Sequence, residues 1–186
     1  MEELIERIKL EGKVIGDDIL KVDSFLNHRV DSILLKKIGE RFARIFESER
    51  VSLVLTVESS GIPPALFTAF YLNVPLIFAR KKRPITLDGR VFERKIVSRT
   101  KLNEVTISLS EEYIKEGERV LIIDDFLATG ETIKALCEMV EEAKGKVVGI
   151  GVCIEKVFQR GRETLKGYKV ESLAKVESLN PLIIRP

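Results

Sequence analysis

Residues 120–132 read VLIIDDFLATGET: four aliphatic residues, two adjacent aspartates, and a turn rich in glycine and threonine. An uninterrupted aliphatic run is typical of a strand that is buried on both faces of a parallel sheet. After the turn, residues 131–143 place Ile133, Leu136 and Val140 at the spacing of one helix face. A buried strand, a short turn and a helix in this order predict an α/β fold.

The same alternation continues on both sides of this stretch. Strands are predicted at residues 51–57, 75–79, 119–123 and 146–154, and further helices at residues 2–11, at 31–47 and after Pro63-Pro64. Asp31 is the predicted N-cap of the helix at 31–47, because a carboxylate accepts hydrogen bonds from the first free N–H groups of a helix. Continuous aliphatic strands joined by helices predict a parallel sheet flanked by helices on both faces.

Three segments depart from this alternation. Residues 91–110 have strand character but are too charged for a central sheet, so we expect a hairpin that projects as an arm. Residues 1–30 and 156–186 also lie outside the alternation, and we expect them to pack together as a small cap over one end of the sheet. A length of 186 residues fits a single domain over residues 1–186.

Charge and hydropathy argue against two kinds of partner. The net charge of +2 offers no basic excess for a nucleic acid backbone. Residues 59–79 carry no charge and approach the length of a membrane span. Three prolines and an asparagine, Pro63, Pro64, Pro75 and Asn73, break this stretch into a turn, a helix and a strand. We therefore expect neither a nucleic acid partner nor a membrane span.

The start of the chain and the cysteines both indicate the cytoplasm. The first residues are acidic and amphipathic, without a basic region followed by an apolar run, so we expect no signal peptide. Cys137 falls on a predicted helix and Cys153 on a predicted strand, with no C-x-x-C pair. Two reduced thiols in the core of a cytoplasmic protein are the expected result.

The two aspartates stand where ligands bind in this class of fold. Ligands of open α/β sheets lie beyond the carboxyl ends of the strands, and Asp124 and Asp125 are placed at such an end. Adjacent carboxylates repel each other unless ribose hydroxyls or a Mg²⁺ ion lie between them. The turn at residues 128–132 leads into a helix, whose N–H groups suit a phosphate together with the hydroxyls of Thr129 and Thr132. These features predict a pocket for ribose 5-phosphate.

The same stretch resembles a known motif, whereas the Walker A and dinucleotide fingerprints are absent. Aliphatic residues, D-D, two residues and A-T-G-x-T resemble the phosphoribosyl pyrophosphate (PRPP) motif of the type I phosphoribosyltransferases. Further segments resemble the bacterial xanthine phosphoribosyltransferases of that family, in matching order: residues 20–28, 58–62, 78–81, 154–159 and 170–174. The resemblance implies the type I phosphoribosyltransferase fold. It also implies transfer of ribose 5-phosphate from Mg²⁺-bound PRPP to a purine base, with release of pyrophosphate.

The resemblance also implies a role for each part of the PRPP site. Asp124 and Asp125 would be the catalytic pair that holds the ribose hydroxyls, with Mg²⁺ bound to them directly or through water. The 5-phosphate would be held by the turn that follows, namely Ala128, Thr129, Gly130, Glu131 and Thr132. The pyrophosphate would be held by residues after two other strands, namely Glu58, Ser59, Ser60, Gly61, Arg80 and Lys81. Arg80 and Lys81 belong to a basic run over residues 80–83 that is otherwise expected to be a solvated surface cluster.

Base choice is expected in the cap. Lys156 can donate to a 6-oxo group but not pair with a 6-amino group, so it favours oxopurines over adenine. By resemblance, Leu20 and Asn27 contact the purine, and the Asn27 amide reads the 2-position oxygen of xanthine. Phe158 is expected either to stack on the ring or to belong to the core. Xanthine is therefore the expected substrate, with guanine, hypoxanthine or adenine as alternatives.

Two further expectations concern assembly and alternative function. The family is typically homodimeric, and the arm at residues 91–110 is our candidate for a closing element that keeps water from the reaction. The same fold also serves PRPP-sensing regulators of purine genes. Those regulators carry an added DNA-binding module, for which this near-neutral sequence shows no basic helix-turn-helix pattern.

Overall fold

The structure of the protein is a computed structural model that describes residues 1–81, 89–98 and 103–186. The α-helices of the described residues are α1 (Glu2–Glu11), α2 (Ser32–Ile45), α3 (Ile62–Leu72), α4 (Glu131–Glu142) and α5 (Gly161–Thr164). The strands of the same residues are β1 (Lys13–Ile15), β2 (Ile19–Lys21), β3 (Leu53–Val57), β4 (Leu76–Ala79), β5 (Val91–Ser98), β6 (Asn103–Ser110), β7 (Arg119–Leu127), β8 (Lys146–Lys156), β9 (Val170–Leu179) and β10 (Leu182–Arg185).

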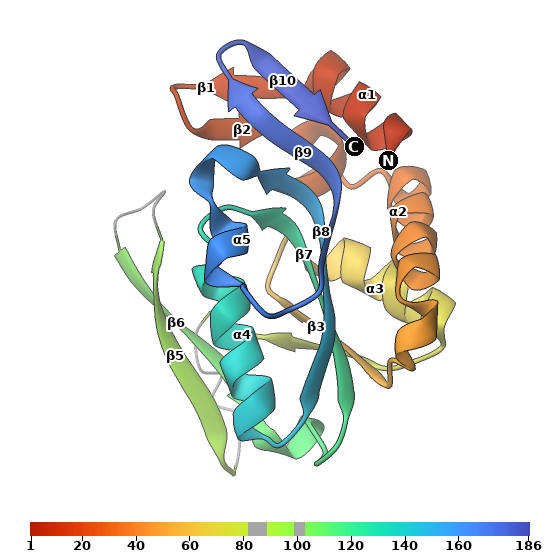
Figure 1. The fold of residues 1–186 in the computed structure, drawn as a ribbon, viewed down its shortest axis with the longest axis vertical. Coiled ribbons are helices and arrows are strands. Elements are labelled where there is room, and N and C mark those ends of the chain that lie inside the picture. The colour runs from red at the N-terminus through yellow and green to blue at the C-terminus, as the bar shows by residue number, and fades with distance from the viewer. Residues whose placement is uncertain (82–88, 99–102) are drawn as a thin grey trace.

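A mostly parallel sheet forms the centre of the molecule (Figure 1). Over the described residues its strand order is β10-β9-β8-β7-β3-β4. Strands β9, β8, β7, β3 and β4 run parallel to one another, and β10 pairs antiparallel with β9. The predicted parallel sheet is confirmed, and its carboxyl edge gathers the ends of β3, β4, β7 and β8, where a ligand of an open α/β sheet is expected.

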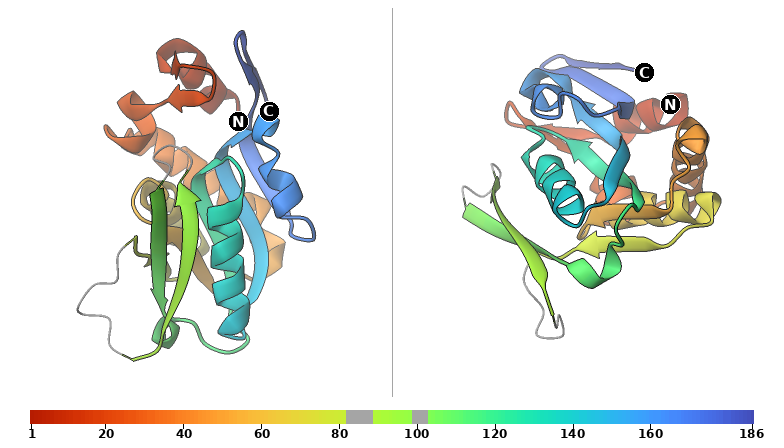
Figure 2. Two further views of the ribbon diagram at one scale, coloured as in Figure 1. Left: turned by 90° about the vertical axis from the view of Figure 1, so that its left-hand side faces the viewer. Right: turned by 60° about the horizontal axis from the view of Figure 1, so that its bottom comes forward.

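Helices cover both faces of this sheet, as the continuous aliphatic strands predict (Figure 2). On one face, Leu121 and Ile123 of β7 share a core with α1, α2 and α3. On the other face, Val120 and Ile122 share a second core with α4 and with part of the β5–β6 hairpin. Each fully buried side chain of this kind stabilises the fold by about 1.5–3 kcal/mol relative to an exposed one.

The helices flanking the site begin where the sequence predicts. At α2, the carboxylate of Asp31 accepts hydrogen bonds from the N–H groups of Ile33 and Leu34, both at 3.1 Å, which confirms the predicted cap. Helix α4 buries Ile133 and Leu136, together with other residues of the same face, as its spacing predicts.

The arm is a two-stranded antiparallel hairpin, which confirms the prediction for residues 91–110. Strands β5 and β6 pair from Val91 opposite Ser110 to Ser98 opposite Asn103. The hairpin stands beside α4 in Figures 1 and 2. It is joined to the end of β4 by two backbone hydrogen bonds, from Arg80 N to Ser108 O at 2.8 Å and from Ser108 N to Arg80 O at 2.7 Å.

Three boundaries differ from the sequence expectation. Strand β7 continues to Leu127, so Asp124 and Asp125 lie within its last residues rather than after it. Strand β8 continues to Lys156, which is therefore the last residue of a central strand. Within residues 156–186, which were expected to lie outside the alternation of strands and helices, β9 and β10 extend the central sheet. Both include charged residues, as strands at or next to the edge of a sheet do, so a search for continuous aliphatic runs does not detect them.

The two chain ends nevertheless lie side by side beyond the carboxyl edge of the sheet (Figure 1). Helix α1 contacts both β9 and β10. The turn between β1 and β2 is joined to the turn between β9 and β10 by a hydrogen bond of 3.4 Å from the Asn180 amide to the Asp17 carboxylate. Among the described residues, no helix is long and apolar enough to cross a membrane.

Candidate active site

One cavity of about 520 Å³ opens at the carboxyl edge of the sheet. The ends of β3, β7 and β8, the start of α4, the N-terminal segment and the arm all contribute to its wall. Of the predicted site residues, it is lined by Leu20, Asn27, Glu58, Ser60, Gly61, Lys81, Asp124, Asp125, Ala128, Thr129, Thr132 and Lys156. The structure therefore brings most of the predicted residues, which are up to 136 positions apart between Leu20 and Lys156, to one place.

The turn after β7 forms a smaller hollow of about 70 Å³ within this region, lined by residues 124 and 126–133. Gly130 has φ +81°, a left-handed conformation that a side chain would strain, and it stands immediately before α4. The first N–H groups of α4 have no carbonyl partner within the helix and face the turn. Backbone N–H groups and the hydroxyls of Thr129 and Thr132 give this hollow the chemistry of a phosphate site.

The acidic pair lies at the boundary between this hollow and the larger cavity. Asp124 is only 6% exposed, and its carboxylate accepts a hydrogen bond of 2.9 Å from the backbone N–H of Asp125. Burial, followed by the charge of Asp125, raises the pKa of Asp124 well above its ordinary value. Burial likewise raises the pKa of Asp125. The charge of Lys81 opposes both shifts, so a cation or hydroxyl donor at this place stabilises the ionised pair.

The donor set of this pair fits one kind of metal. Among the described residues, no group of three or more His, Cys, Asp or Glu side chains is arranged to hold an ion. Mg²⁺ commonly binds through one or two carboxylates, several waters and the phosphate oxygens of a substrate. Asp124 is buried and the adjacent Asp125 is half-buried, and both are short of counter-charge, which suits a Mg²⁺ ion brought by a phosphorylated ligand.

The loop from Glu58 to Gly61 joins β3 to α3 at the same edge. The Glu58 carboxylate accepts a hydrogen bond of 2.6 Å from the backbone N–H of Lys81 and pairs with the Arg80 guanidinium at 3.1 Å. This carboxylate thus ties together the two segments predicted to bind pyrophosphate. Ser60 and Gly61 line the cavity.

Two residues assigned to pyrophosphate do not line the cavity in this structure, namely Ser59 and Arg80. The Arg80 guanidinium lies 5.4 Å from the ring centroid of Phe78 and is held by Glu58. The remainder of the predicted basic run, Lys82 and Arg83, lies outside the described residues.

Another part of the cavity wall, called the base end below, carries the residues predicted to read a base. The Lys156 ammonium donates a hydrogen bond of 2.6 Å to the backbone carbonyl of Asp18 and lies 5.5 Å from the ring centroid of Phe126. Burial lowers the pKa of Lys156, opposed by the charges of Asp18 and Asp125. The Asn27 side-chain oxygen is buried and has no hydrogen-bond partner in the described part of the chain. A buried polar atom without a partner at a cavity wall is suited to a ligand.

The structure does not bring Phe158 to this cavity. Its side chain is 38% exposed, in the short helical turn after β8, so it is neither a core residue nor part of the cavity wall. Phe126 occupies the wall instead, from within the strand that carries the acidic pair. In the sequence Phe126 directly follows the two acids, and because β7 continues through it, it lies at the same edge of the sheet.

Other wall residues were also missed by the sequence analysis. These are Asp18, Ile19 and Gln159, together with Ile96 and Val105 of the arm. The stretch Gly16-Asp17-Asp18 is a recognisable turn between two short strands, and reading it as a hairpin places Ile19 at the cap. No pattern in the arm distinguishes the residues that face the cavity from the others.

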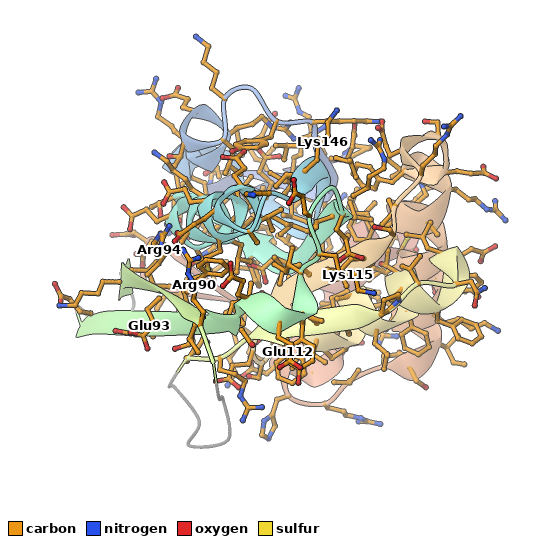
Figure 3. All side chains as sticks on the ribbon, turned by 90° about the horizontal axis from the view of Figure 1, so that it is seen from below. Arg90, Glu93, Arg94, Glu112, Lys115 and Lys146 are labelled. Atoms are coloured by element: carbon orange, nitrogen blue, oxygen red, sulfur yellow. The ribbon has the colours of Figure 1, made fainter. Side chains whose placement is uncertain are left out.

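Ion pairs hold the arm against α4. The Arg94 guanidinium of β5 pairs with Glu142 at 2.7 Å and with Glu138 at 3.4 Å. Figure 3 shows Arg90 and Arg94 on the side of β5 that faces α4, and Glu93 on the other side. Since Ile96 follows on the same strand and lines the cavity, these ion pairs help to set one wall of the site.

The fold and this arrangement of phosphate turn, acidic pair and base end define a class of enzyme. Residues 29–178 match the family described as phosphoribosyl transferase domain, and the chain belongs to that family. The xanthine phosphoribosyltransferase of Geobacillus thermodenitrificans (strain NG80-2) is 49% identical over 187 residues, which cover 100% of this chain and 96% of that protein. The xanthine phosphoribosyltransferase of Shouchella clausii (strain KSM-K16) is 50% identical over 182 residues, 96% of this chain and 90% of that protein.

Solved structures share the fold. The crystal structure of adenine phosphoribosyltransferase from Thermoanaerobacter pseudethanolicus superposes with a TM-score of 0.78 at 28% identity, over 92% of this chain and 99% of that one. The adenine phosphoribosyltransferase of Rhodothermus marinus gives a TM-score of 0.77 at 26% identity, over 95% and 100% of the two chains. The type I phosphoribosyltransferase fold is thus confirmed from both sequence and structure.

Proposed function

We propose that this chain is a purine salvage enzyme that converts xanthine and PRPP to xanthosine monophosphate and pyrophosphate. The observation that carries the proposal is one cavity of about 520 Å³ whose wall combines two kinds of chemistry. Part of the wall offers the acidic pair and the phosphate turn, and another part offers the Lys156 ammonium and the Asn27 oxygen, which has no partner among the described residues. Identity near 50% to proteins named for xanthine, over nearly the full length, supports the same substrate.

PRPP is placed by three parts of the site. The 5-phosphate binds to the N–H and hydroxyl donors of residues 128–132, in the hollow before α4. The ribose hydroxyls bind to the carboxylates of Asp124 and Asp125. The pyrophosphate binds to the backbone of the Glu58–Gly61 loop and to Lys81, whose positive charge favours the ionised form of both acids. Asp124 and Asp125 would hold Mg²⁺ directly or through water, and the ion would supply positive charge that offsets the charge of the leaving pyrophosphate.

Catalysis follows from this placement. A purine ring nitrogen attacks the anomeric carbon of the ribose while the bond to pyrophosphate breaks, and no protein nucleophile is needed. Positive charge develops on the sugar ring, close to the carboxylates of Asp124 and Asp125, which stabilise it. Water is a competing nucleophile, and the apolar side chains of Ile96 and Val105 close the cavity on the side of the arm.

The base end favours an oxopurine. A lysine ammonium has hydrogen-bond donors only, so Lys156 pairs with the 6-oxo group of xanthine but not with the 6-amino group of adenine. The Asn27 amide carries both an acceptor and donors, so it can donate to the 2-oxo group or accept from a ring N–H. Leu20, which is 4% exposed, and Phe126 supply apolar surface for the ring.

Adenine is the alternative with a specific observation in its favour, because solved structures with this fold are adenine phosphoribosyltransferases. The decisive experiment offers xanthine, guanine, hypoxanthine and adenine in parallel, each with PRPP and Mg²⁺, and measures nucleotide formation. The proposal requires the highest kcat/KM with xanthine. A preference for adenine would overturn both the substrate and the role of Lys156.

We also propose that the chain acts as a homodimer. Helix α3 exposes two large apolar side chains one turn apart, Leu66 at 53% and Phe70 at 72%, which water does not favour unless another surface covers them. Light scattering behind size-exclusion chromatography measures the mass, and Phe70→Glu is expected to shift a dimer of this interface toward monomer. A monomeric mass of about 21.1 kDa for the unmodified chain would rule the dimer out.

A cytoplasmic location completes the proposal. Cys137 and Cys153 are buried free thiols, which is the usual state of cysteines in a reducing compartment. Fractionation of cells that express the chain tests this directly, and recovery outside the cytoplasm would contradict it.

A further inference from the structure

The segment from Glu155 to Arg162 closes on itself through an ion pair. Glu155 stands next to the end of β8 and is 3% exposed. Its carboxylate accepts two parallel hydrogen bonds from the Arg162 guanidinium, at 2.9 Å and 2.7 Å. This forked geometry is the strong form of an arginine–carboxylate contact.

The same guanidinium is fixed on β9. It donates hydrogen bonds of 2.8 Å to the carbonyl of Val170 and of 3.0 Å to the hydroxyl of Ser172, and that hydroxyl donates in turn to Glu155. Burial by itself would raise the pKa of Glu155, but the bonds from Arg162 and Ser172 together outweigh it and lower the pKa. Glu155 is therefore a buried, ionised group whose charge is balanced by Arg162, and a change of either partner leaves a charge without its partner.

Between the two partners, the closed segment carries residues of the active site. Lys156 follows Glu155 directly and lines the base end of the cavity, and Gln159 lines it further along. Arg162 itself does not line the cavity. The ion pair thus lies behind the side chains that face the ligand.

The closed segment also supports the phosphate turn from behind. A Cβ atom on Gly161 would lie 2.2 Å from the carbonyl oxygen of Ala128, which no real structure permits. In the same way, a Cβ atom on Gly130 would lie 2.7 Å from the carbonyl oxygen of Gly161. The backbone before Arg162 and the backbone of the phosphate turn are therefore in direct contact, and a shift of one displaces the other.

We propose that Arg162 is a positioning residue for both substrates, which acts through Glu155 to place Lys156 and through Gly161 to support the turn that binds the 5-phosphate. This inference rests on the proposed function of the site. Arg162 should not affect pyrophosphate, because the residues proposed to bind pyrophosphate, the Glu58–Gly61 loop and Lys81, follow β3 and β4 rather than β8. Loss of Arg162 should weaken the binding of ribose 5-phosphate at the turn and of the purine at the base end, but not the binding of pyrophosphate.

The test is Arg162→Gln, with Arg160→Gln as the matched control. Arg160 lies on the same segment, is exposed, and pairs only with Glu163 in the described structure. Isothermal titration measures binding of ribose 5-phosphate and of Mg²⁺-pyrophosphate, and steady-state kinetics give KM for xanthine and PRPP. We expect Arg162→Gln to lower the affinity for ribose 5-phosphate about tenfold and to raise KM for xanthine. Removing one partner of a buried charge pair typically has an effect of at least this size. Pyrophosphate affinity and the control should stay within about twofold.

Equal weakening of ribose 5-phosphate and pyrophosphate binding in a folded Arg162→Gln variant, like unchanged binding of both, would overturn the inference. Two further variants apply if Arg162→Gln does not fold. Arg162→Lys keeps the charge but loses the fork, and it should show the same selective loss in smaller degree. Gly161→Ala adds a Cβ atom that clashes with the Ala128 carbonyl oxygen and leaves the ion pair intact, so it should weaken the binding of ribose 5-phosphate alone.

The outcome is independent of the choice of purine. If the unmodified enzyme binds ribose 5-phosphate but does not use xanthine, the proposed substrate fails while the ribose 5-phosphate measurements still decide the role of Arg162. If the unmodified enzyme uses xanthine and Arg162→Gln binds ribose 5-phosphate normally, only the role of Arg162 fails.

Discussion

The ammonium group of Lys156 lies 5.5 Å from the centroid of the Phe126 ring. These residues come from the ends of β8 and β7, which are neighbours in the sheet. The ring and the Asp18 carbonyl, which accepts a hydrogen bond from the ammonium at 2.6 Å, hold the charge at the base end of the cavity. Two residues on adjacent strands therefore fix the position of the ammonium that we propose recognises a purine oxygen.

Replacement of this lysine should affect xanthine use directly. Lys156→Ala removes a charged hydrogen-bond donor, which is expected to lower kcat/KM for xanthine about ten- to a hundredfold. Lys146→Ala is the control, because Lys146 is an exposed residue at the opposite end of the same strand. Steady-state assays with xanthine check the prediction, and unchanged turnover would show that Lys156 does not read the base.

The aromatic ring should contribute separately. Phe126→Leu keeps an apolar side chain in the cavity wall but removes the attraction between ring and ammonium, worth about 1 kcal/mol. We expect KM for xanthine to rise about fivefold and KM for PRPP to change little. Equal changes in both values would indicate a general distortion of the end of β7 instead.

Asp124→Asn should stabilise the metal-free protein and inactivate it. The folded pKa of Asp124 is raised by burial and by Asp125, so ionisation is more costly in the folded than in the unfolded chain. The stability that this group gives at low pH is lost as pH rises through the folded pKa. Asparagine does not ionise, so the variant does not lose this stability, and its amide oxygen can still accept the hydrogen bond from the Asp125 N–H. The unfolding temperature at pH 8, measured in EDTA, should therefore be higher for the variant.

The difference in unfolding temperature between Asp124→Asn and the unmodified chain should disappear only below the ordinary aspartate pKa of 3.8, where the acid becomes protonated in both states. Phosphoribosyl transfer should fall by at least about a hundredfold, because a charge that stabilises the transition state is lost. A variant that is less stable than the unmodified chain at pH 8 would contradict this account of the pair.

The ion pairs of the arm should affect the fate of PRPP. Arg94→Ala removes the contacts with Glu138 and Glu142, so the wall formed by Ile96 is held less firmly. We expect the ratio of xanthosine monophosphate formed to PRPP hydrolysed to decrease. Lys95→Ala is the control, since Lys95 pairs with Glu104 within the hairpin. If Arg94→Ala and Lys95→Ala gave the same ratio of product to hydrolysed PRPP, the ion pairs between the arm and α4 would have no role in excluding water.

The cap of α2 gives a stability prediction with a defined pH dependence. The N–H of Leu34 contributes most to lowering the pKa of Asp31, with help from Arg7 and Ile33 and against the effect of burial. A lowered folded pKa gives stability that is present above the unfolded pKa and is lost as pH falls through the folded one. Asp31→Ala should therefore cost about 1 kcal/mol at pH 7 and less near pH 3. Asp31→Asn, which keeps the cap, should cost less at pH 7, and chemical denaturation measures both.

Much of the fold could be predicted because its strands obey a simple physical rule. Strands β3, β7 and β8 are buried on both faces and read as aliphatic runs, and α4 shows the spacing of a half-buried helix. Strand β9 escaped prediction because it is only partly buried and includes charged residues such as Glu171 and Lys175. A strand that is buried on both faces reads as a continuous aliphatic run, whereas a partly buried strand near the edge of the sheet does not.

The candidate site, too, has one part that could be predicted from the sequence and one that could not. Its phosphate turn and acidic pair are contiguous in sequence, so local chemistry was enough to predict them. The base end joins Asp18, Phe126 and Gln159 from three distant segments, and only the fold brings them together. Phe158 and Gln159 are neighbours in sequence, yet Gln159 alone lines the cavity, because the helical turn after β8 rotates one side chain inward and the other outward.

The two backbone hydrogen bonds between Arg80 and Ser108 make the hairpin and the segment that carries Lys81 one mechanical unit. The hairpin cannot swing outward as a rigid body unless it breaks those bonds or pulls Arg80 and Lys81 along with it. In either case, opening the arm would disturb the segment that we propose to bind pyrophosphate, so that on this proposal pyrophosphate release and solvent entry are linked events.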